Sequence, residues 1–578
     1  MCGIVGYIGD NNVKNNLLNG LKALEYRGYD SSGICLGNKK NLKIYKSIGK
    51  VDNLIKQVKN VNFNSSFGIA HTRWATHGKV SLENCHPQRY GDVILVHNGI
   101  IENYKSLLKD VTLQSQTDSE YIAALLSKEN GENISKINNV IKKLEGTFAL
   151  AIIFEEDKEH IYVTKRSCPL AILKSDFGNY ISSDIGAYIN DSSCYTFLDD
   201  DEIAVVSKNN VKIYNRNLEI IQKEFIKSDL TTYKPSSSLY SCYMEKEIYE
   251  QPDVIKKTIN NIKNIPKLNL KKYKNITVCA CGSALYAGNC FKYLAEEYLS
   301  IPINIEIASE FRYKKILIPD NSLMIFVSQS GETADTIASL KIAKEKNIET
   351  LAICNTPLST IARIADNTIY TLAGSEISVA TTKAYTAQIA TFMSIILNEL
   401  EDNTYLLKEF NKLPNILEVI LNDLEKIKEI AKKIHNHNDV FYIGRNIDNV
   451  FCQEGSLKLK EISYIHSESY PAGELKHGSI SLINENTPVI CIATYKKTIS
   501  KTLNNLEECK TRGAFTILIS DLDLENNADI VYKLPPVDDF FIPITTQVVL
   551  QLIAFYTATY KKVDIDKPRN LAKSVTVE

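Results

Sequence analysis

A cysteine stands second in the chain, in the run Met1-Cys2-Gly3-Ile4-Val5-Gly6-Tyr7. Removal of the initiator methionine would leave Cys2 with both a thiol and a free α-amine. The amine has a reference pKa near ~7.7, so a large share of it is unprotonated at neutral pH and can act as a base for the thiol. The alternative is that Cys2 has no chemical role and is only a small residue ahead of a buried strand, since most thiols are inert packing residues. Position alone favours that alternative.

Four further residues carry groups that an attack on a carboxamide needs. Asn98 could supply a side-chain N–H to an oxyanion hole and Gly99 a backbone N–H, because glycine allows a close approach of the main chain. Arg73 could bind the carboxylate of a free amino acid, and Asp118 its ammonium group. Each residue also has a structural alternative: a turn at Asn98-Gly99, a surface or sheet-edge pair at Arg73, and a helix cap at Asp118.

In combination these motifs are specific. MCGIVGY, HTRWATHG, HNGIIENY and QTDSE follow one another, and residues 1–227 that hold them resemble the glutamine amidotransferase domain of the N-terminal nucleophile (Ntn) type. The resemblance implies that Cys2 attacks the side-chain amide of glutamine, forms a glutamyl thioester and releases ammonia. It also implies that Trp74 gates an internal ammonia passage. The glutamine-binding residues that it implies are Arg73, Trp74, Thr76, His77, Asn98, Gly99 and Asp118.

A second group of hydroxyls lies in the run Phe326-Val-Ser-Gln-Ser-Gly-Glu-Thr, where a strand ends and a helix begins. Ser328, Ser330 and Thr333 place hydroxyls where the N–H groups of a helix point outward, and Gln329 adds an amide donor. Such a turn suits a phosphate group. The alternative is a serine-rich helix cap.

A charged helix face, a histidine and a lysine in the C-terminal tail follow later in the chain. Glu454, Lys458 and Glu461 are spaced i, i+4 and i+7, so they share one helix face. Most such stripes are solvated and hold ordinary ion pairs, which is the alternative here. His477 follows as an acid–base group. Lys573 lies in the C-terminal tail, and although tails normally fray, a desolvated lysine there would be a carbonyl nucleophile.

These later motifs also carry a resemblance. SQSGETADT, EGSLKLKEISYIH, GELKHG and DKPRNLAKSVTVE resemble the isomerase half of the glutamine–fructose-6-phosphate aminotransferases, the glucosamine-6-phosphate synthases. Both halves occur in the family's order, and the resemblance covers nearly all of the 578 residues. It implies an enzyme that makes D-glucosamine 6-phosphate and L-glutamate from D-fructose 6-phosphate and L-glutamine, the first step of the hexosamine pathway to UDP-N-acetylglucosamine.

The resemblance assigns roles at the sugar site. His477 assists opening of the fructose ring from the neighbouring subunit, which implies a homodimer. Lys573 forms a Schiff base with the C2 carbonyl, Glu461 moves the proton between C1 and C2, and Lys458 and Glu454 support that site. The residues implied to bind the sugar phosphate are Ser283, Ser328, Gln329, Ser330, Thr333, Val379, Lys458 and Ala572.

The chain departs from the family pattern at three positions. Ala284 replaces a hydroxyl residue after Cys281-Gly282-Ser283, which puts one phosphate or sugar contact in doubt. Thr381 stands where serine is usual, and Ser479 replaces a proline. None of these changes removes a group assigned to the chemistry.

Two other classes of function are compatible with parts of this sequence. One is a related transferase or deglycase acting on another sugar, such as a fructosamine phosphate; the intact glutaminase motifs argue against it. The other is a non-catalytic sugar-phosphate sensor, and the presence together of Glu461, His477 and Lys573 argues against that.

The elements that must position these residues differ between the two parts of the chain. Residues 1–227 contain short alternating or apolar runs and two helical patterns, which predict a strand-rich α+β domain with two sheets packed face to face and helices outside. This is the four-layer Ntn-type arrangement. The strands are expected over residues 3–8, 67–70, 92–96, 147–154, 160–164 and 202–206, and the helices over 13–26 and 119–126.

The remainder of the chain predicts parallel sheets. Residues 228–245 have the composition of a linker, and strands and helices then alternate in two similar series. Two doubly wound units follow, which the resemblance identifies as sugar isomerase (SIS) domains. We expect them over residues 246–425 and 426–563, with an active-site tail over 564–578. The first strand of each series ends in a glycine turn, at Gly282 and at Gly444, and neither turn reads GxGxxG, so a dinucleotide is not expected.

Composition excludes several classes. The net charge of −1 gives no basic excess for nucleic acid. The 13 cysteines lack the paired spacing of a zinc site, and we expect no metal and no cofactor. The most apolar segments, residues 389–397 and 548–556, are short or interrupted and predict buried helices rather than membrane spans. No secretory signal is visible, and a reducing cytoplasm fits this composition.

Overall fold

The computed structural model of the chain describes residues 2–75, 77–108, 111–227 and 240–576. The chain divides into two compact units, the first comprising residues 1–234 and 574–578 and the second residues 235–573. The segment predicted as a linker lies mostly outside the described residues, which resume at Tyr240. Each unit has its own sheets and its own hydrophobic core.

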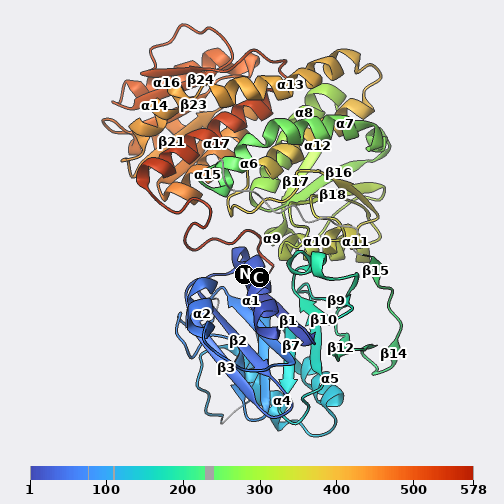
Figure 1. Cartoon of the computed structure of the whole chain (residues 1–578). Coiled ribbons are helices and arrows are strands. Elements are labelled where there is room, and N and C mark those ends of the chain that lie inside the picture. The colour runs from blue at the N-terminus through green and yellow to red at the C-terminus, as the bar shows by residue number, and fades with distance from the viewer. Residues whose placement is uncertain (1, 76, 109–110, 228–239, 577–578) are drawn as a thin grey trace. The chain divides into compact units, whose positions relative to one another are not determined.

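Within the described residues the first unit contains two antiparallel sheets (Figure 1). One has eight strands in the order β15-β11-β9-β10-β1-β4-β2-β3, and the other has seven in the order β14-β13-β12-β8-β7-β6-β5. The first sheet consists of β1 Gly3–Gly9, β2 Ser31–Gly37, β3 Leu42–Ile48, β4 Phe67–Arg73, β9 Ala171–Ser175, β10 Gly178–Ser182, β11 Cys194–Phe197 and β15 Ile226–Lys227. The second consists of β5 Gln88–Tyr90, β6 Val93–Ile101, β7 Gly146–Phe154, β8 Ile161–Arg166, β12 Ile203–Val206, β13 Val211–Tyr214 and β14 Ile220–Ile221.

These two sheets pack face to face because their facing sides are apolar. Ile4 on the first sheet and Val96 on the second are buried in one cluster. Helix α1 (Val13–Leu24) packs on the other side of β1 and β4. Helices α4 (Asp118–Lys128) and α5 (Asn133–Lys143) bury their apolar sides on the second sheet. The predicted arrangement of two central sheets between helices is confirmed.

The second unit contains two parallel sheets of five strands with matching orders, β17-β16-β18-β19-β20 and β22-β21-β23-β24-β25. In each sheet the first strand in sequence (β16 or β21) is followed by an edge strand on one side of it (β17 or β22). The chain then crosses over to form the next strand on its opposite side (β18 or β23). The second strand of the order and its central neighbour therefore form a topological switch point, where open α/β sheets bind ligands. The strands are β16 Asn275–Ala280, β17 Ile303–Ile307, β18 Ser322–Ser328, β19 Glu349–Cys354, β20 Asn367–Tyr370, β21 Asp439–Gly444, β22 His466–Pro471, β23 Pro488–Ile492, β24 Phe515–Ser520 and β25 Ile530–Lys533.

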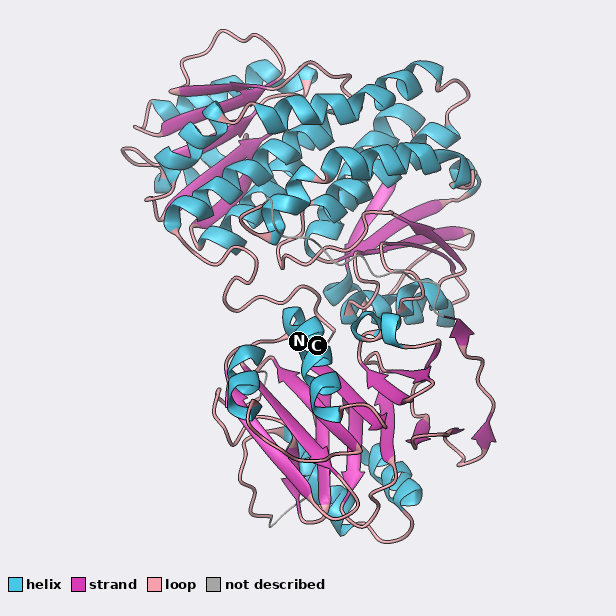
Figure 2. Cartoon of the chain, viewed as in Figure 1, coloured by secondary structure: helices cyan, strands magenta, loops and turns pink. Residues whose placement is uncertain are grey.

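Long helices cover both parallel sheets and join them through one continuous core (Figure 2). Four of them supply most of its apolar side chains: α8 (Gly282–Leu299), α12 (Lys383–Glu399), α15 (Ile447–Ser463) and α17 (Ile542–Lys561). The two doubly wound units predicted from the sequence are thus confirmed. The remaining α-helices of the described chain are α2 Val51–Val58, α3 Tyr104–Leu107, α6 Tyr243–Tyr249, α7 Gln251–Asn261, α9 Ala308–Phe311, α10 Ala334–Glu345, α11 Thr360–Ile364, α13 Thr404–Asn422, α14 Glu425–Ile434 and α16 Ile499–Lys510.

Helix α17 is long and apolar enough to cross a membrane by length and composition alone. Its apolar window is 94% buried inside the protein, however, which makes it a core helix. The prediction of a buried helix there is confirmed. Residues 389–397 lie in α12 and are likewise buried.

Two candidate active sites

The first candidate site lies where β1 begins. Strand β1 pairs with β4 so that Gly3 stands opposite Thr72, which places the end of β4 beside Cys2. The Trp74 N–H donates to Cys2 Sγ at 3.3 Å, and Asn98 Nδ2 donates to the Cys2 carbonyl oxygen at 3.0 Å. Burial raises the pKa of the Cys2 thiol, so the thiol needs a base before it can act as a nucleophile. The structure thus brings Cys2, Trp74 and Asn98 together.

The side chain of Asn98 is oriented by a histidine that the sequence analysis did not single out. His71 Nε2 lies 3.1 Å from Asn98 Oδ1 and 2.9 Å from the His97 carbonyl oxygen. Burial lowers the pKa of His71 to about 3, so the ring is neutral, and two acceptors at Nε2 require its proton to be there. Because His71 donates to Oδ1, the Nδ2 group of Asn98 must face Cys2. His71 is the first polar residue of the HTRWATHG motif, which is the signal that could have identified it.

Gly99 follows Asn98 in β6 and has a backbone φ of +140°. A Cβ atom there would lie 2.1 Å from the Thr147 carbonyl oxygen on the paired strand β7. A side chain at this position would therefore force β6 and β7 apart. Glycine is needed for the fold of the strand pair that carries Asn98.

Gly99→Ala is accordingly expected to destabilise the first unit by roughly 1–3 kcal/mol or more, because it adds a backbone clash to an unfavourable φ. The measurement is the unfolding temperature of the full chain. Gly131→Ala is the matched control: its φ is +111°, but the nearest atom to the added Cβ would be 4.0 Å away. Equal unfolding temperatures for the two variants would contradict the argument from the strand pair.

The two charged residues predicted to hold an amino acid are buried and bonded to the backbone. The Arg73 guanidinium donates to the carbonyl oxygens of His77, Gly78 (3.1 Å) and Lys79 (3.4 Å). Asp118 Oδ2 accepts the N–H of Ile101 at 2.9 Å. Asp118 is an acidic residue in the first turn of α4, as the helix-cap alternative expects, and its carboxylate also bonds to the end of β6. Their contact with an amino acid stays a prediction.

The other predicted glutamine-binding residues have aromatic neighbours. Trp74 meets Tyr29 edge to face at 5.9 Å between ring centroids, and His77 meets Tyr104 in the same way at 5.7 Å. Thr76 lies outside the described residues.

The second candidate site begins at the carboxyl end of β18, at the switch point of the first parallel sheet. Ser328 Oγ lies 2.8 Å from Thr333 Oγ1 and accepts the N–H of Gly331 at 3.0 Å. Ser330 Oγ accepts the N–H of Glu332 at 3.1 Å. Three hydroxyls therefore gather in the loop between β18 and α10. Gln329 lies in the same loop.

The stripe on α15 faces this switch point. Ser283, in the first turn of α8, donates through Oγ to Glu454 Oε1 at 3.0 Å. Lys458 Nζ lies 2.6 Å from Glu461 Oε2 and 3.4 Å from Glu454 Oε1. The side chains of Glu454 and Lys458 are 0% and 1% exposed, so the alternative of a solvated stripe is wrong for these two residues.

Burial and the neighbouring charges together set the protonation of Glu454 and Lys458. It raises the pKa of Glu454 to about 7. Burial alone would lower the pKa of Lys458, but the carboxylates of Glu454 and Glu461 outweigh it and raise that pKa. Lys458 is therefore a permanent cation that holds Glu461 in place, while the Glu461 side chain remains 20% exposed and accessible.

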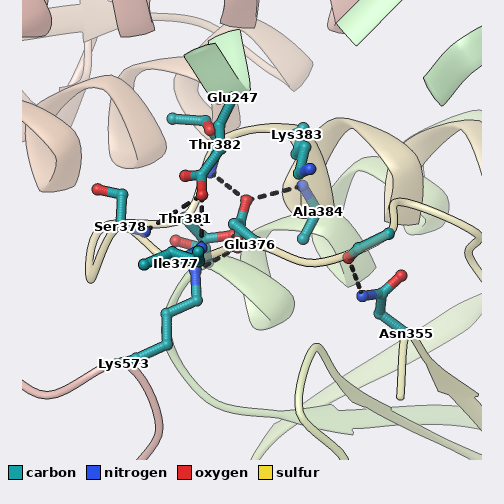
Figure 3. A network of polar contacts seen from close by, with 12 residues as sticks. Glu247, Asn355, Glu376, Ile377, Ser378, Thr381, Thr382, Lys383, Ala384 and Lys573 are labelled. Atoms are coloured by element: carbon teal, nitrogen blue, oxygen red, sulfur yellow. Dashed lines mark hydrogen bonds and ion pairs between the residues drawn. The ribbon is translucent and has the colours of Figure 1, made fainter. Parts of the chain in front are cut away.

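The C-terminal tail is fixed to the second unit through Asp566 and Lys573. The Asp566 carboxylate accepts the N–H groups of Tyr243 and Met244 at 2.8 Å each, and its backbone oxygen accepts the N–H of Val379 at 3.0 Å. The Lys573 ammonium forms an ion pair with Glu376, and both side chains are nearly inaccessible (Figure 3). Lys573 is therefore desolvated, as the sequence analysis required of a nucleophilic lysine.

Glu376 is a residue that sequence reasoning missed. It lies in the loop between β20 and α12, in a run of polar and small residues without helical or strand periodicity. Its carboxylate accepts the N–H groups of Thr382 (2.9 Å) and Ala384 (3.0 Å) and the Thr381 hydroxyl (2.8 Å). Thr381, one of the departures from the family pattern, thus uses its hydroxyl inside this network.

Two predicted sugar-site residues, His477 and Ala572, take no part in the hydrogen-bond networks described around Glu461 and Lys573. His477 is exposed in a short 3-10 turn, Leu475–His477, and within the described part of one chain no hydrogen bond or ion pair joins its ring to Glu461 or Lys573. Ala572 is half-buried next to Lys573. No group of three or more metal-binding side chains occurs among the described residues, and their cysteines are free.

Comparison with known proteins agrees with this architecture. The SIS domain family matches residues 269–398 and 433–561, and the glutamine amidotransferase domain family matches residues 81–189. The isomerizing glutamine–fructose-6-phosphate aminotransferases of Caldanaerobacter subterraneus subsp. tengcongensis and Fusobacterium nucleatum subsp. nucleatum are 42% and 41% identical to the chain. Both alignments cover all of both proteins.

Solved structures match the second unit. The C-terminal domain of the glucosamine-fructose-6-phosphate aminotransferase of Francisella tularensis aligns over its whole length with 58% of this chain, with a TM-score of 0.54 and 37% identity. The Escherichia coli tagatose-6-phosphate ketose/aldose isomerase, at 18% identity and a TM-score of 0.52, shares the fold; it aligns over 99% of its length with 59% of this chain. From the full-length identity, the domain matches and the two sites, the chain belongs to the family of isomerizing glutamine–fructose-6-phosphate aminotransferases.

Proposed function

We propose that this chain transfers the amide nitrogen of L-glutamine to D-fructose 6-phosphate and isomerises the product to D-glucosamine 6-phosphate, releasing L-glutamate. Full-length identity of 42% to an isomerizing glutamine–fructose-6-phosphate aminotransferase carries the proposal. Incubation of the purified protein with both substrates, followed by identification of the amino sugar, tests it. A deglycase acting on another sugar, or a sensor, would form no glucosamine 6-phosphate under these conditions.

At the glutaminase site Cys2 is the nucleophile, and its α-amine, once Met1 is removed, accepts the thiol proton. The Asn98 side chain, oriented by His71, and the Gly99 N–H stabilise the oxyanion. Arg73 and Asp118 bind the carboxylate and the ammonium of glutamine. Trp74, Thr76 and His77 complete the pocket, and Trp74 gates the passage of ammonia.

At the sugar site the phosphate is held by the β18–α10 loop, in which the hydroxyls of Ser328 and Thr333 lie 2.8 Å apart. Lys573 forms the Schiff base with C2, and Glu461, held by Lys458, moves the proton between C1 and C2. The phosphate-binding residues are Ser328, Gln329, Ser330 and Thr333. Ser283, Val379 and Ala572 line the sugar, and Glu454 supports Lys458.

His477 completes the sugar site from a second copy of the chain. Its exposure in a single chain supports this assignment, because a ring-opening acid–base group must reach substrate. The working form is then a homodimer in the cytoplasm. Within each chain we propose a glutaminase domain over residues 1–227, SIS domains over 246–425 and 426–563, and a tail over 564–578.

Only one of the two parallel sheets is expected to bind sugar phosphate. At the corresponding loop after β23, the N–H groups of Thr494 and Tyr495 each donate to Asp448 Oδ2 at 3.0 Å, and the Thr494 hydroxyl also bonds to Asp448. The buried carboxyl group of Asp448 therefore already accepts the N–H groups that would bind an anion there.

Titration calorimetry with fructose 6-phosphate should therefore give one site per chain. A Ser328→Ala/Ser330→Ala double variant should weaken binding at that single site. If the second sheet also bound fructose 6-phosphate, the double variant would still release the heat of binding at that other site. Two sites per wild-type chain would contradict the assignment of Asp448.

A further inference from the structure

The environment of Lys573 contains a second buried acid that no motif marked. Glu376 and Glu247 both face the tail lysine from other elements of the second unit (Figure 3). Glu376 is in direct contact with the Lys573 ammonium, and Glu247, on α6, accepts the N–H groups of Ile377 and Ser378 (3.2 Å). Two carboxyl groups therefore share the surroundings of one reactive cation.

The protonation of the two acids differs because of their partners. Burial and the neighbouring carboxylate of Glu376 raise the pKa of Glu247 to about 8, so Glu247 is mostly neutral at pH 7. Burial alone would raise the pKa of Glu376, but Lys573 and the donors from Thr382 and Ala384 outweigh it and lower that pKa. The site therefore holds one carboxylate against one lysine cation.

Formation of a Schiff base leaves this charge balance unchanged. One ammonium proton first moves to the Glu376 carboxylate, because only the neutral amine has the electron pair that attacks C2. The Lys573 nitrogen then bonds to C2, the C2–O bond breaks, and the oxygen leaves as water with that proton and one more from the nitrogen. The product is a protonated imine, so the positive charge is on the same nitrogen before and after the step, and Glu376 is again a carboxylate. A carboxylate that is already fixed beside that nitrogen needs no rearrangement to serve both states.

We propose that Glu376 is the counterion of the protonated Schiff base on Lys573, keeping the imine in the cationic form that accepts electrons when Glu461 removes a proton from the sugar carbon. This inference rests on the proposed role of Lys573. The carboxylate of Glu376 is held by two backbone N–H groups and the Thr381 hydroxyl, so its position is set before substrate arrives. Other charged or titratable groups that face the pair are Glu247, Lys383 and Lys458.

Glu376→Gln tests the proposal, because it keeps the size and removes the charge. Without the counterion the imine loses its proton at a lower pH. The alkaline limb of the pH profile for sugar isomerisation should therefore move down by about 1–3 pH units. Glu376→Asp keeps the charge and should restore the wild-type limb in part. A merely structural role would lower activity equally at every pH.

Glu250→Gln is the matched control, because among the described residues the Glu250 carboxylate pairs with Lys383 (2.6 Å) and Lys246 (3.2 Å) rather than with Lys573. It should leave the pH profile unchanged. An unshifted alkaline limb in Glu376→Gln, with sugar phosphate still bound as judged by calorimetry, would overturn the inference.

Reductive trapping separates failure of this inference from failure of the proposed function. Treatment with cyanoborohydride and fructose 6-phosphate should modify Lys573 in the wild type, and the modified peptide is identified by mass spectrometry. No modification of the wild type would overturn the role of Lys573 itself. Modification of wild type and Glu376→Gln with the same pH dependence would overturn the counterion alone.

Discussion

Cys2→Ala abolishes glutamine hydrolysis if Cys2 is the amino-terminal nucleophile. Alanine has no thiol with which to form the thioester, so the rate should fall on the order of 10³-fold or more. Asn98 bonds to the backbone oxygen of residue 2 and keeps that contact in the variant, whereas the Trp74 N–H loses its bond to the sulfur. Because only this one bond is lost, the fold should survive. The measurement is glutamate release from glutamine.

Cys194→Ala provides the control, because Cys194 is another free and half-buried thiol of the same unit. It should keep wild-type glutaminase activity. Cys2→Ala should also keep its affinity for fructose 6-phosphate, whose proposed site lies in the second unit. Unchanged glutaminase activity in Cys2→Ala would contradict the assignment of the nucleophile.

Lys573→Ala removes the proposed Schiff-base nitrogen and should lower formation of glucosamine 6-phosphate on the order of 10³-fold or more. Glutamine hydrolysis, for which Cys2 is the proposed nucleophile, should persist. The buried Glu376 loses its cationic partner in this variant, so some loss of stability is expected as well.

Two measurements keep these effects apart. Calorimetry shows whether the variant still binds sugar phosphate, and the unfolding temperature shows how far stability has fallen. Lys567→Ala, in the same tail but outside the proposed site, should convert sugar at the wild-type rate. Formation of glucosamine 6-phosphate at the wild-type rate by Lys573→Ala would exclude the Schiff base.

The fold could largely be predicted because local patterns and global structure agree. The apolar run at β1, the helix that follows it and the repeated strand–helix series are all visible in the sequence and are where the structure has them. The apolar segments of α12 and α17 predicted helices from the sequence, but for α17 length and composition alone allow a membrane span, and only its burial in the folded unit identifies it as a core helix.

The sites were only partly predictable, since motifs identify reactive groups but not the partners that tertiary structure brings to them. His71 orients Asn98 from a strand of the other sheet. Glu376 meets Lys573 across almost two hundred residues of sequence. Neither pairing has a local spacing that could have indicated it. The burial of Glu454 and Lys458 was hidden in the same way, because the i, i+4 pattern is shared by exposed helices.

In the proposed function, one chain both releases the amide nitrogen of glutamine and transfers it to a sugar phosphate. The most direct test supplies the purified protein with fructose 6-phosphate and glutamine labelled with ¹⁵N at the side-chain amide, and measures the label in the sugar product by mass spectrometry. We expect glucosamine 6-phosphate that carries ¹⁵N, formed in equal amount to glutamate. Release of glutamate and labelled ammonia without labelled amino sugar would contradict it.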